Sequence, residues 1–301
     1  MIGSVAAKIK RGEGSMTKNA AKKMLDKAMG ADGWGAIKDC TEDKFEDAGA
    51  LLDGLDEASI KNIPDGTFEK VMDTFGAVHT WGKGQEKELA VKFRKTIGDF
   101  TNCTAAGLDK IKGFIPGLTA AELANIPKDA FKDAAKSIAE SFQKIGAFAE
   151  DQLKAMEKQV KDSYAAAMKD TASFTADIVD EIGDLMGVVD VADLKKLGKT
   201  ACKKIKRAAV KMMGGKKAAE AFTADKLKEF SDEAKAAFNG NDLKAIADLG
   251  AEGLAKLKAV VCKDDATKGF TCPGAICDFV VDHDGVKKDA EILAQFKNRF
   301  A

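Results

Sequence analysis

Residues 103–131 read CTAAGLDKIKGFIPGLTAAELANIPKDAF, and residues 40–68 read CTEDKFEDAGALLDGLDEASIKNIPDGTF, 63 positions earlier and without a gap. We call these segments repeat A (40–68) and repeat B (103–131). They share a leading Cys-Thr, a Gly-Leu pair, an Asn-Ile-Pro triplet and a final phenylalanine. Unrelated segments rarely agree at so many positions of distinct chemistry. The chain therefore contains an internal repeat, and the repeat decides the fold.

The spacing inside repeat B predicts two helices joined at a sharp corner. Thr119 and Glu122 stand three residues apart, as in a capping box that satisfies the free amides of a first helical turn. Pro127 ends this short helix and can start the next one, because it has no amide hydrogen to donate. Phe131 then points inward. A helix pair of this size cannot cover its own apolar side, so it must stack on neighbouring pairs.

Fainter copies and a long periodic segment complete the expected architecture. Residues 194–198 and 246–250 repeat the frame of two apolar residues followed by glycine. Apolar residues recur in steps of three and four from Ile138 to Met168, which predicts one long helix. The sequence thus predicts an all-α protein of stacked helix pairs, either an irregular α-solenoid or a multi-helix bundle, with one long central helix. Its expected parts are a basic helical segment (1–34), the repeat pair with the long helix (35–170) and degenerate repeats with a cysteine-rich end (171–301).

Composition limits the classes of partner. The chain has 301 residues, and its 48 basic residues balance its 48 acidic ones, so no overall field attracts nucleic acid. No segment reaches the roughly 18–20 apolar residues that cross a bilayer, so no transmembrane segment is expected.

Motifs of catalysis and metal binding are missing from the sequence. It has no nucleophile elbow, P-loop, dinucleotide fingerprint or zinc-protease motif, and its two histidines are far apart. Asp282, Asp284 and Glu291 resemble half of an EF-hand, but Val280 stands where the loop needs its first ligand, so an ordinary turn explains them. We expect no enzymatic activity, no cofactor and no metal.

The chain has six cysteines, an even number with three near the end. This pattern favours disulfides, with Cys40–Cys103 and Cys272–Cys277 as the predicted pairs and Cys202–Cys262 left by elimination. The alternative is a set of buried free thiols in a cytosolic helical protein.

Two further observations bear on location. The N-terminal stretch turns basic after a few apolar residues and is not a signal peptide. Asn102 begins the only glycosylation sequon, Asn-Cys-Thr. With the disulfides, these features predict a secreted or cell-surface protein whose leader is absent from this chain; a cytoplasmic location is the alternative.

Charge is segregated in the last third of the chain. Residues 177–193 contain six acids and no base, whereas residues 199–217 contain eight bases and no acid. A solvated helix face explains such runs, and a docking patch for a polyanion, an acidic surface or a neighbouring copy is the functional interpretation. Nucleic acid is disfavoured, since no aromatic residues are interleaved. Met212 and Met213 are candidates for the apolar centre of such a contact. The candidate assembly patch consists of Asp177, Asp180, Glu181, Asp184, Lys203, Lys204, Lys206 and Arg207.

The segment LTAAELANIPKDAF (118–131) resembles the helical repeats of the mesothelin, otoancorin and stereocilin group of cell-surface and extracellular proteins. The resemblance covers repeats A and B, and it implies short helix pairs stacked into a superhelix for adhesion. We therefore expect a non-enzymatic structural or adhesive protein, extracellular, that associates with itself or with another surface protein. The alternative is a carrier that holds lipid or another apolar ligand between phenylalanine-lined helices. An intracellular scaffold is the third possibility.

Overall fold

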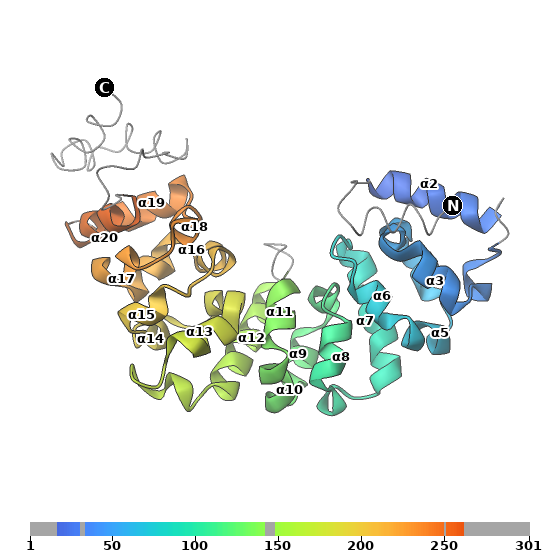
Figure 1. Cartoon of the computed structure of the whole chain (residues 1–301), viewed down its shortest axis with the longest axis horizontal. Coiled ribbons are helices and arrows are strands. Elements are labelled where there is room, and N and C mark those ends of the chain that lie inside the picture. Colours follow the sequence, from blue (N-terminus) through green and yellow to red (C-terminus); the bar gives the residue numbers. More distant parts are fainter. Residues whose placement is uncertain (1–16, 31–33, 142–147, 250, 262–301) are drawn as a thin grey trace, which may run out of the picture. The chain divides into compact units, whose positions relative to one another are not determined.

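The computed structural model describes residues 17–30, 34–141, 148–249 and 251–261. Throughout these ranges the regular elements are α-helices and 3₁₀-helices, and none is a strand (Figure 1). The all-α prediction is confirmed. The chain divides into two compact units, Met1–Gln159 (unit 1) and Val160–Ala301 (unit 2), which are described separately below.

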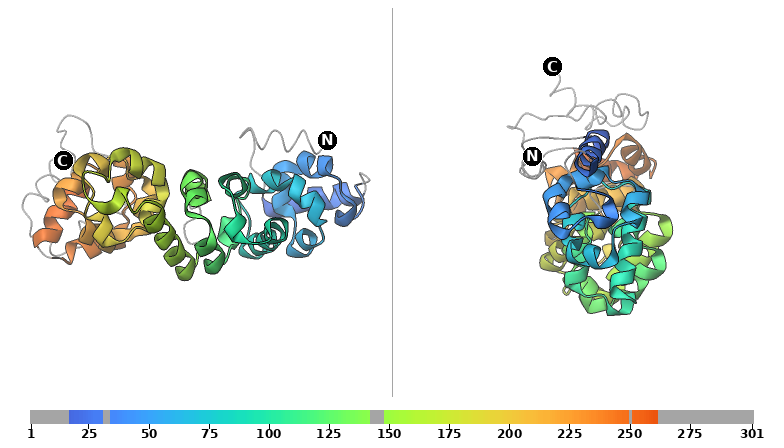
Figure 2. Two further views of the ribbon diagram at one scale, coloured as in Figure 1. Left: turned by 90° about the horizontal axis from the view of Figure 1, so that it is seen from below. Right: turned by 90° about the vertical axis from the view of Figure 1, so that its right-hand side faces the viewer.

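Unit 1 consists mostly of short helices, with longer ones of 13 to 15 residues among them, and Figure 2 shows it from two further directions. In chain order its elements are α2 (Lys18–Gly30), η1 (Ile37–Asp39), α3 (Glu42–Ala48), η2 (Gly49–Gly54), α4 (Glu57–Lys61), α5 (Asp65–Lys70), α6 (Met72–Gly76), α7 (Lys83–Ile97), η3 (Phe100–Asn102), α8 (Ala105–Lys110), η4 (Ile115–Gly117), α9 (Ala120–Asn125), α10 (Lys128–Asp133), α11 (Ala135–Ser141) and most of α12 (Glu150–Ser163).

Unit 2 continues in the same manner. After the end of α12 it contains η5 (Ala167–Lys169), α13 (Ala176–Ile182), η6 (Gly183–Gly187), α14 (Val191–Leu194), α15 (Lys199–Cys202), α16 (Arg207–Ala221), α17 (Ala224–Lys228), α18 (Asp232–Lys235), α19 (Gly240–Ala247) and α20 (Ala251–Val261).

Repeats A and B fold alike, as their sequences predict. Each runs through a short helix, a 3₁₀ turn and a second short helix, and then turns into a third helix. In repeat B the Thr119 hydroxyl accepts from the Glu122 amide at 3.3 Å, and the Glu122 carboxylate accepts from the Thr119 amide at 2.7 Å. Pro64 and Pro127 precede α5 and α10 as extended N-cap residues. The capping box and the proline corner are thus confirmed.

The fainter copy expected at 194–198 belongs to a third full repeat, repeat C (174–202), which lies 71 residues after repeat B. It has the same order of elements, α13, η6, α14 and α15, and Gly198 takes the place of Pro127 before the last helix. Gly49 and Gly183 end the first helix of repeats A and C with φ of 47° and 60°, a conformation that favours glycine.

The phenylalanines fill the core of unit 1. Ring centroids lie 5.4 Å apart for Phe68 and Phe75, 5.7 Å for Phe45 and Phe75, and 6.4 Å for Phe68 and Phe114, close to the usual spacing of interacting rings. Phe68 and Phe131, which end repeats A and B, are both fully buried. The inner face of the repeat was therefore assigned correctly.

The single long helix is not confirmed. Helix α11 ends at Ser141, residues 142–147 lie outside the described part of the chain, and α12 starts at Glu150. Gln152 defines this start: its Oε1 accepts from the Ala149 amide at 2.6 Å, and its Nε2 donates to the Pro116 carbonyl at 2.9 Å. The spacing of apolar residues does not predict this helix start, because a hydrogen bond from Gln152 to η4 fixes it.

Candidate functional site

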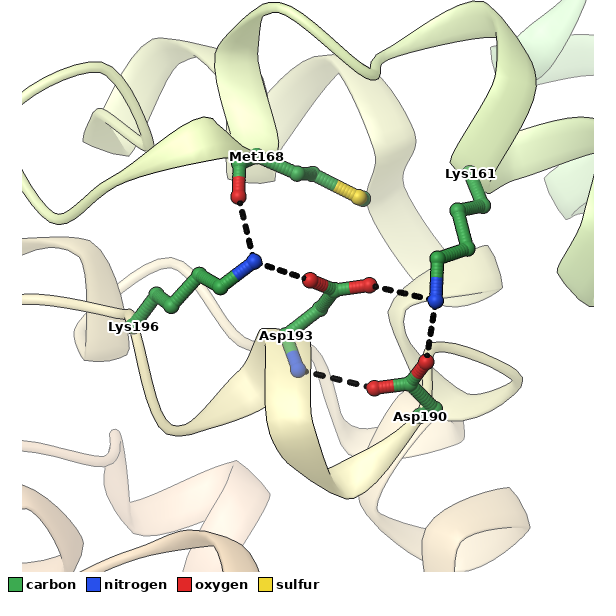
Figure 3. Close-up of polar contacts among 5 residues, drawn as sticks. All are labelled: Lys161, Met168, Asp190, Asp193 and Lys196. Carbon is green, nitrogen blue, oxygen red and sulfur yellow. Dashed lines mark hydrogen bonds and ion pairs between the residues drawn. The ribbon is translucent and has the colours of Figure 1, made fainter.

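A network of ion pairs around one buried carboxylate lies at the first turn of α14 (Figure 3). Asp193 is 4% exposed, and its carboxylate receives the Lys196 ammonium at 2.5 Å and the Lys161 ammonium at 3.4 Å. Lys161 also pairs with Asp190 at 2.8 Å, and Lys196 donates to the Met168 carbonyl at 3.0 Å. The network thus ties α12 and η5 to α14.

The sequence places these charges through helix capping. Asp190 is the N-cap of α14, and its side chain accepts from the Asp193 amide at 2.8 Å. Partial burial of Asp190 opposes its ionisation, but the bonds from Lys161 and from the Asp193 amide lower its pKa below the usual value. The Asp190 carboxylate raises the pKa of Lys161 in turn. Both groups are therefore charged at neutral pH, which suits a clamp better than proton transfer.

The same clamp recurs in each repeat. Offsets of 63 and 71 residues align Asp190 with Thr119 and Asp56, which are all N-caps. In each repeat a base from the α-helix that precedes the repeat pairs with an acid of the first turn after this N-cap or with the N-cap itself. The bases and acids are Lys22 with Asp56, Arg94 with Glu122, and Lys161 with Asp190 and Asp193. Because every repeat has one, we assign this network to the architecture of the protein.

A second recurring contact, made by a glutamine side chain, is not predicted by the sequence repeat. Gln85 in α7 donates to the carbonyls of Asp53 and Leu55, and Gln152 in α12 donates to those of Pro116 and Leu118. The acceptors are 63 residues apart but the donors are 67 apart, so an alignment without gaps cannot pair the two glutamines.

The basic run 199–217 is engaged in part within unit 2. Lys199 pairs with Asp225 at 2.9 Å, Lys203 with Glu229 at 3.3 Å and Lys206 with Asp180 at 3.7 Å. The last pair joins the two charged runs. The two runs thus neutralise each other in part, through Lys206 and Asp180.

The remaining acids of the predicted patch are divided between surface and interior. Asp177 is exposed. Glu181 is exposed too and accepts from the Tyr164 hydroxyl at 3.2 Å. Asp184 is half-buried, and this burial raises its pKa although the nearby Lys206 lowers it. The acidic run is therefore partly committed inside unit 2.

Lys204 and Arg207 differ from the other bases of the predicted patch. Both are exposed, as is Lys211 one turn further along α16, and none of the three forms an ion pair within the described part of unit 2. Met213, a candidate apolar centre beside them, is only 6% exposed, and Met212 packs on Gly187. Lys204, Arg207 and Lys211 thus form an exposed basic surface. Met213 is too buried to be the apolar centre of a contact there.

Cys40, Cys103 and Cys202 are free and buried thiols, so the predicted bridge between Cys40 and Cys103 does not form in the structure. Burial raises the pKa of Cys103 to about 11 and that of Cys202 to about 12. These thiols stay protonated and unreactive at neutral pH. The other three predicted disulfide cysteines, Cys262, Cys272 and Cys277, lie outside the described residues.

The remaining predictions concern the glycosylation sequon, the half EF-hand, metal sites and membrane spans. Asn102, the sequon residue, is exposed at the end of η3. The acidic stretch around Asp282 and Asp284 lies outside the described residues. In the part of the chain that the structure describes, no group of His, Cys, Asp or Glu is arranged to hold a metal ion. None of the described helices has both the length and the apolar character to span a bilayer.

A cleft of about 400 Å³ lies between α2, η2 and the start of α7. Asp53, which lines it, is 7% exposed, and its Oδ1 lies 3.0 Å from the Lys18 ammonium without a well-aligned hydrogen bond. Repeat B builds the same corner with Pro116 in place of Asp53 and Ala120 in place of Glu57. The corner does not need these acids. They accompany the lysines of α2, which suits the docking of this helix.

No family model, curated protein or solved structure matches the chain. The resemblance to the mesothelin group therefore stays a prediction.

Proposed function

We propose that this protein is a non-enzymatic structural or adhesive protein, which acts outside the cell by associating with copies of itself or with another surface protein. The observation that carries the proposal is the exposed basic surface at Lys204, Arg207 and Lys211. The neighbouring Lys199, Lys203 and Lys206 are each paired within unit 2, so the basic run contains more cations than its own unit engages.

The architecture supports this proposal. Side chains about 28 residues apart bind each other along unit 1, as in Lys112 with Glu140 at 3.0 Å and Ser137 with Asp109 at 2.5 Å. Each short helix therefore contacts elements close to it in sequence, as expected of stacked helix pairs. Such stacks present extended surfaces for partners, and the recurring ion pairs at the N-terminal turns of α4, α9 and α14 link each repeat to the helix before it.

The alternative, a lipid carrier, has less support. A ligand groove between phenylalanine-lined helices needs aromatic side chains that face a space. Phe222 and Phe230 instead lie 5.1 Å apart edge to face and are almost fully buried, like the rings of unit 1. These phenylalanines therefore belong to the hydrophobic core and do not line a groove.

A concentration series tests the proposal. In sedimentation velocity at low ionic strength, we expect the weight-average mass to rise with protein concentration. A strict monomer that co-purifies with lipid would favour the carrier instead. Intact mass after secretion from eukaryotic cells, with Asn102→Gln as the matched variant, tests the extracellular assignment through loss of the glycan mass. A wild-type chain with the mass of the bare polypeptide would leave the assignment without support from the sequon.

A further inference from the structure

We infer that copies of this protein associate head to tail, with Lys204, Arg207 and Lys211 of one copy bound to Asp43, Glu46 and Asp47 on α3 of the next. This inference rests on the proposed self-association and names the two surfaces that carry it. It also replaces the acidic partner expected from sequence, the run 177–193, with a different acidic surface in unit 1.

The basic surface is built by the turn between α15 and α16. Ile205 is buried there, which directs the residues on both sides of it to solvent. Arg207 and Lys211 lie one helical turn apart on α16, so they share a face. The two acids that contact the turn between α15 and α16 are already engaged: Asp180 pairs with Lys206, and Glu229 pairs with Lys203.

The acidic surface is the outer face of α3. Phe45 and Ala48 face the core, whereas Asp43, Glu46 and Asp47 are exposed at positions i, i+3 and i+4 of one helix face. None of the three forms an ion pair within the described part of unit 1.

The bases near α3 are occupied. Lys70 pairs with Glu42, Lys38 pairs with Asp39, and Lys44 donates to the Trp34 carbonyl at 2.7 Å. The outer face of α3 thus keeps a net negative charge, as the α15–α16 turn keeps a net positive one.

Charge complementarity between two different surfaces of one chain makes the contact heterologous. Such a contact closes into a ring or extends as a filament, whereas a symmetric dimer would need one self-complementary surface. Since exposed ion pairs are individually weak and are screened by salt, we expect a weak and salt-sensitive association.

Two triple charge reversals test the inference. Lys204→Glu with Arg207→Glu and Lys211→Glu makes the basic surface acidic, and Asp43→Lys with Glu46→Lys and Asp47→Lys makes the acidic surface basic. Each variant alone presents like charges at both surfaces, so its association constant should fall at least about tenfold. An equimolar mixture should regain association, because the wild-type surfaces pair with each other and so do the reversed ones.

The matched control is Lys87→Glu with Lys136→Glu, two exposed lysines of unit 1 that form no ion pair within its described residues. This control should associate like the wild type, and circular dichroism should show all variants folded. If the wild type associates and each triple reversal alone associates as strongly as the wild type, the two surfaces are wrongly assigned while self-association stands. A mixture that stays monomeric would show that the surfaces do not meet between copies. A wild type that is monomeric at every concentration and salt would overturn both proposals.

Discussion

At the scale of single residues, the repeat works because a few side chains have fixed tasks. Thr119 and Glu122 close the first turn of a helix, Pro127 starts the next one, and Phe131 fills the core. These tasks are local in sequence, so spacing alone reveals them. Gln152 and Asp193 also have structural tasks, but each binds a partner that is distant in sequence, Pro116 and Lys161 respectively, and no local pattern marks those contacts.

Phe131→Ala is the sharpest test at this scale. The ring is fully buried, so its removal should leave a cavity and lower the free energy of unfolding by about 3–5 kcal/mol, measured by urea denaturation. Phe68→Ala should behave alike, since Phe68 holds the same position in repeat A. A loss below about 0.5 kcal/mol in either variant would contradict the assignment of the inner face, because only surface changes are usually that small.

At the scale of the elements, helices meet through close backbone approaches and capped corners. Repeat A contacts α2 at Gly54, where a Cβ atom would lie 2.3 Å from the backbone nitrogen of Lys22. Repeat B contacts α7 at Gly117, where a Cβ would lie 2.1 Å from the Glu86 carbonyl oxygen. The shared glycine was visible in the sequence. Its contacts with α2 and α7 were not, because these two helices belong to no recognisable copy of the repeat.

Gly54→Ala should therefore push α2 away from η2. We expect a loss of about 1–3 kcal/mol in the free energy of unfolding, typical of an overpacked site. Gly66→Ala is the matched control, since its Cβ would meet nothing within 4 Å. It should leave the protein unchanged or slightly more stable. Equal effects of the two changes would show that α2 does not pack on Gly54.

The clamp at α14 predicts how stability depends on pH. The pKa of Asp190 is lowered in the folded protein, from a usual value of 3.8. A lowered folded pKa means that the unfolded chain binds the proton first, so this contribution to stability is present above the unfolded pKa and is lost as pH falls through the folded one.

Asp190→Asn isolates that contribution, because asparagine also caps a helix well but does not titrate. The difference in thermal stability between wild type and variant should be constant at neutral pH and shrink below about pH 4. A difference that persists unchanged at pH 2 would show that the ionised carboxylate does not support the clamp.

At the scale of the whole molecule, sequence and structure agree on fold class and differ on how charge is used. The helical content, the repeat and the core phenylalanines follow from local spacing. The charged runs do not, because pairing depends on which helices meet: Lys206 reaches back to Asp180, whereas Lys199 and Lys203 reach forward to Asp225 and Glu229. Only Lys204 and Arg207 of the predicted basic patch remain without an ion pair in the described part of unit 2.

The central claim is association through exposed charge, and the mass of the wild-type protein as salt is raised tests it most directly. The screening length falls from about 10 Å at 0.1 M salt to about 3 Å at 1 M, so contacts between exposed charges weaken over this range. At a fixed high protein concentration, static light scattering should report a mass well above 31.9 kDa at low salt and a return toward that value at 1 M. A mass of one chain at low salt, or an assembly that salt leaves unchanged, would contradict the account.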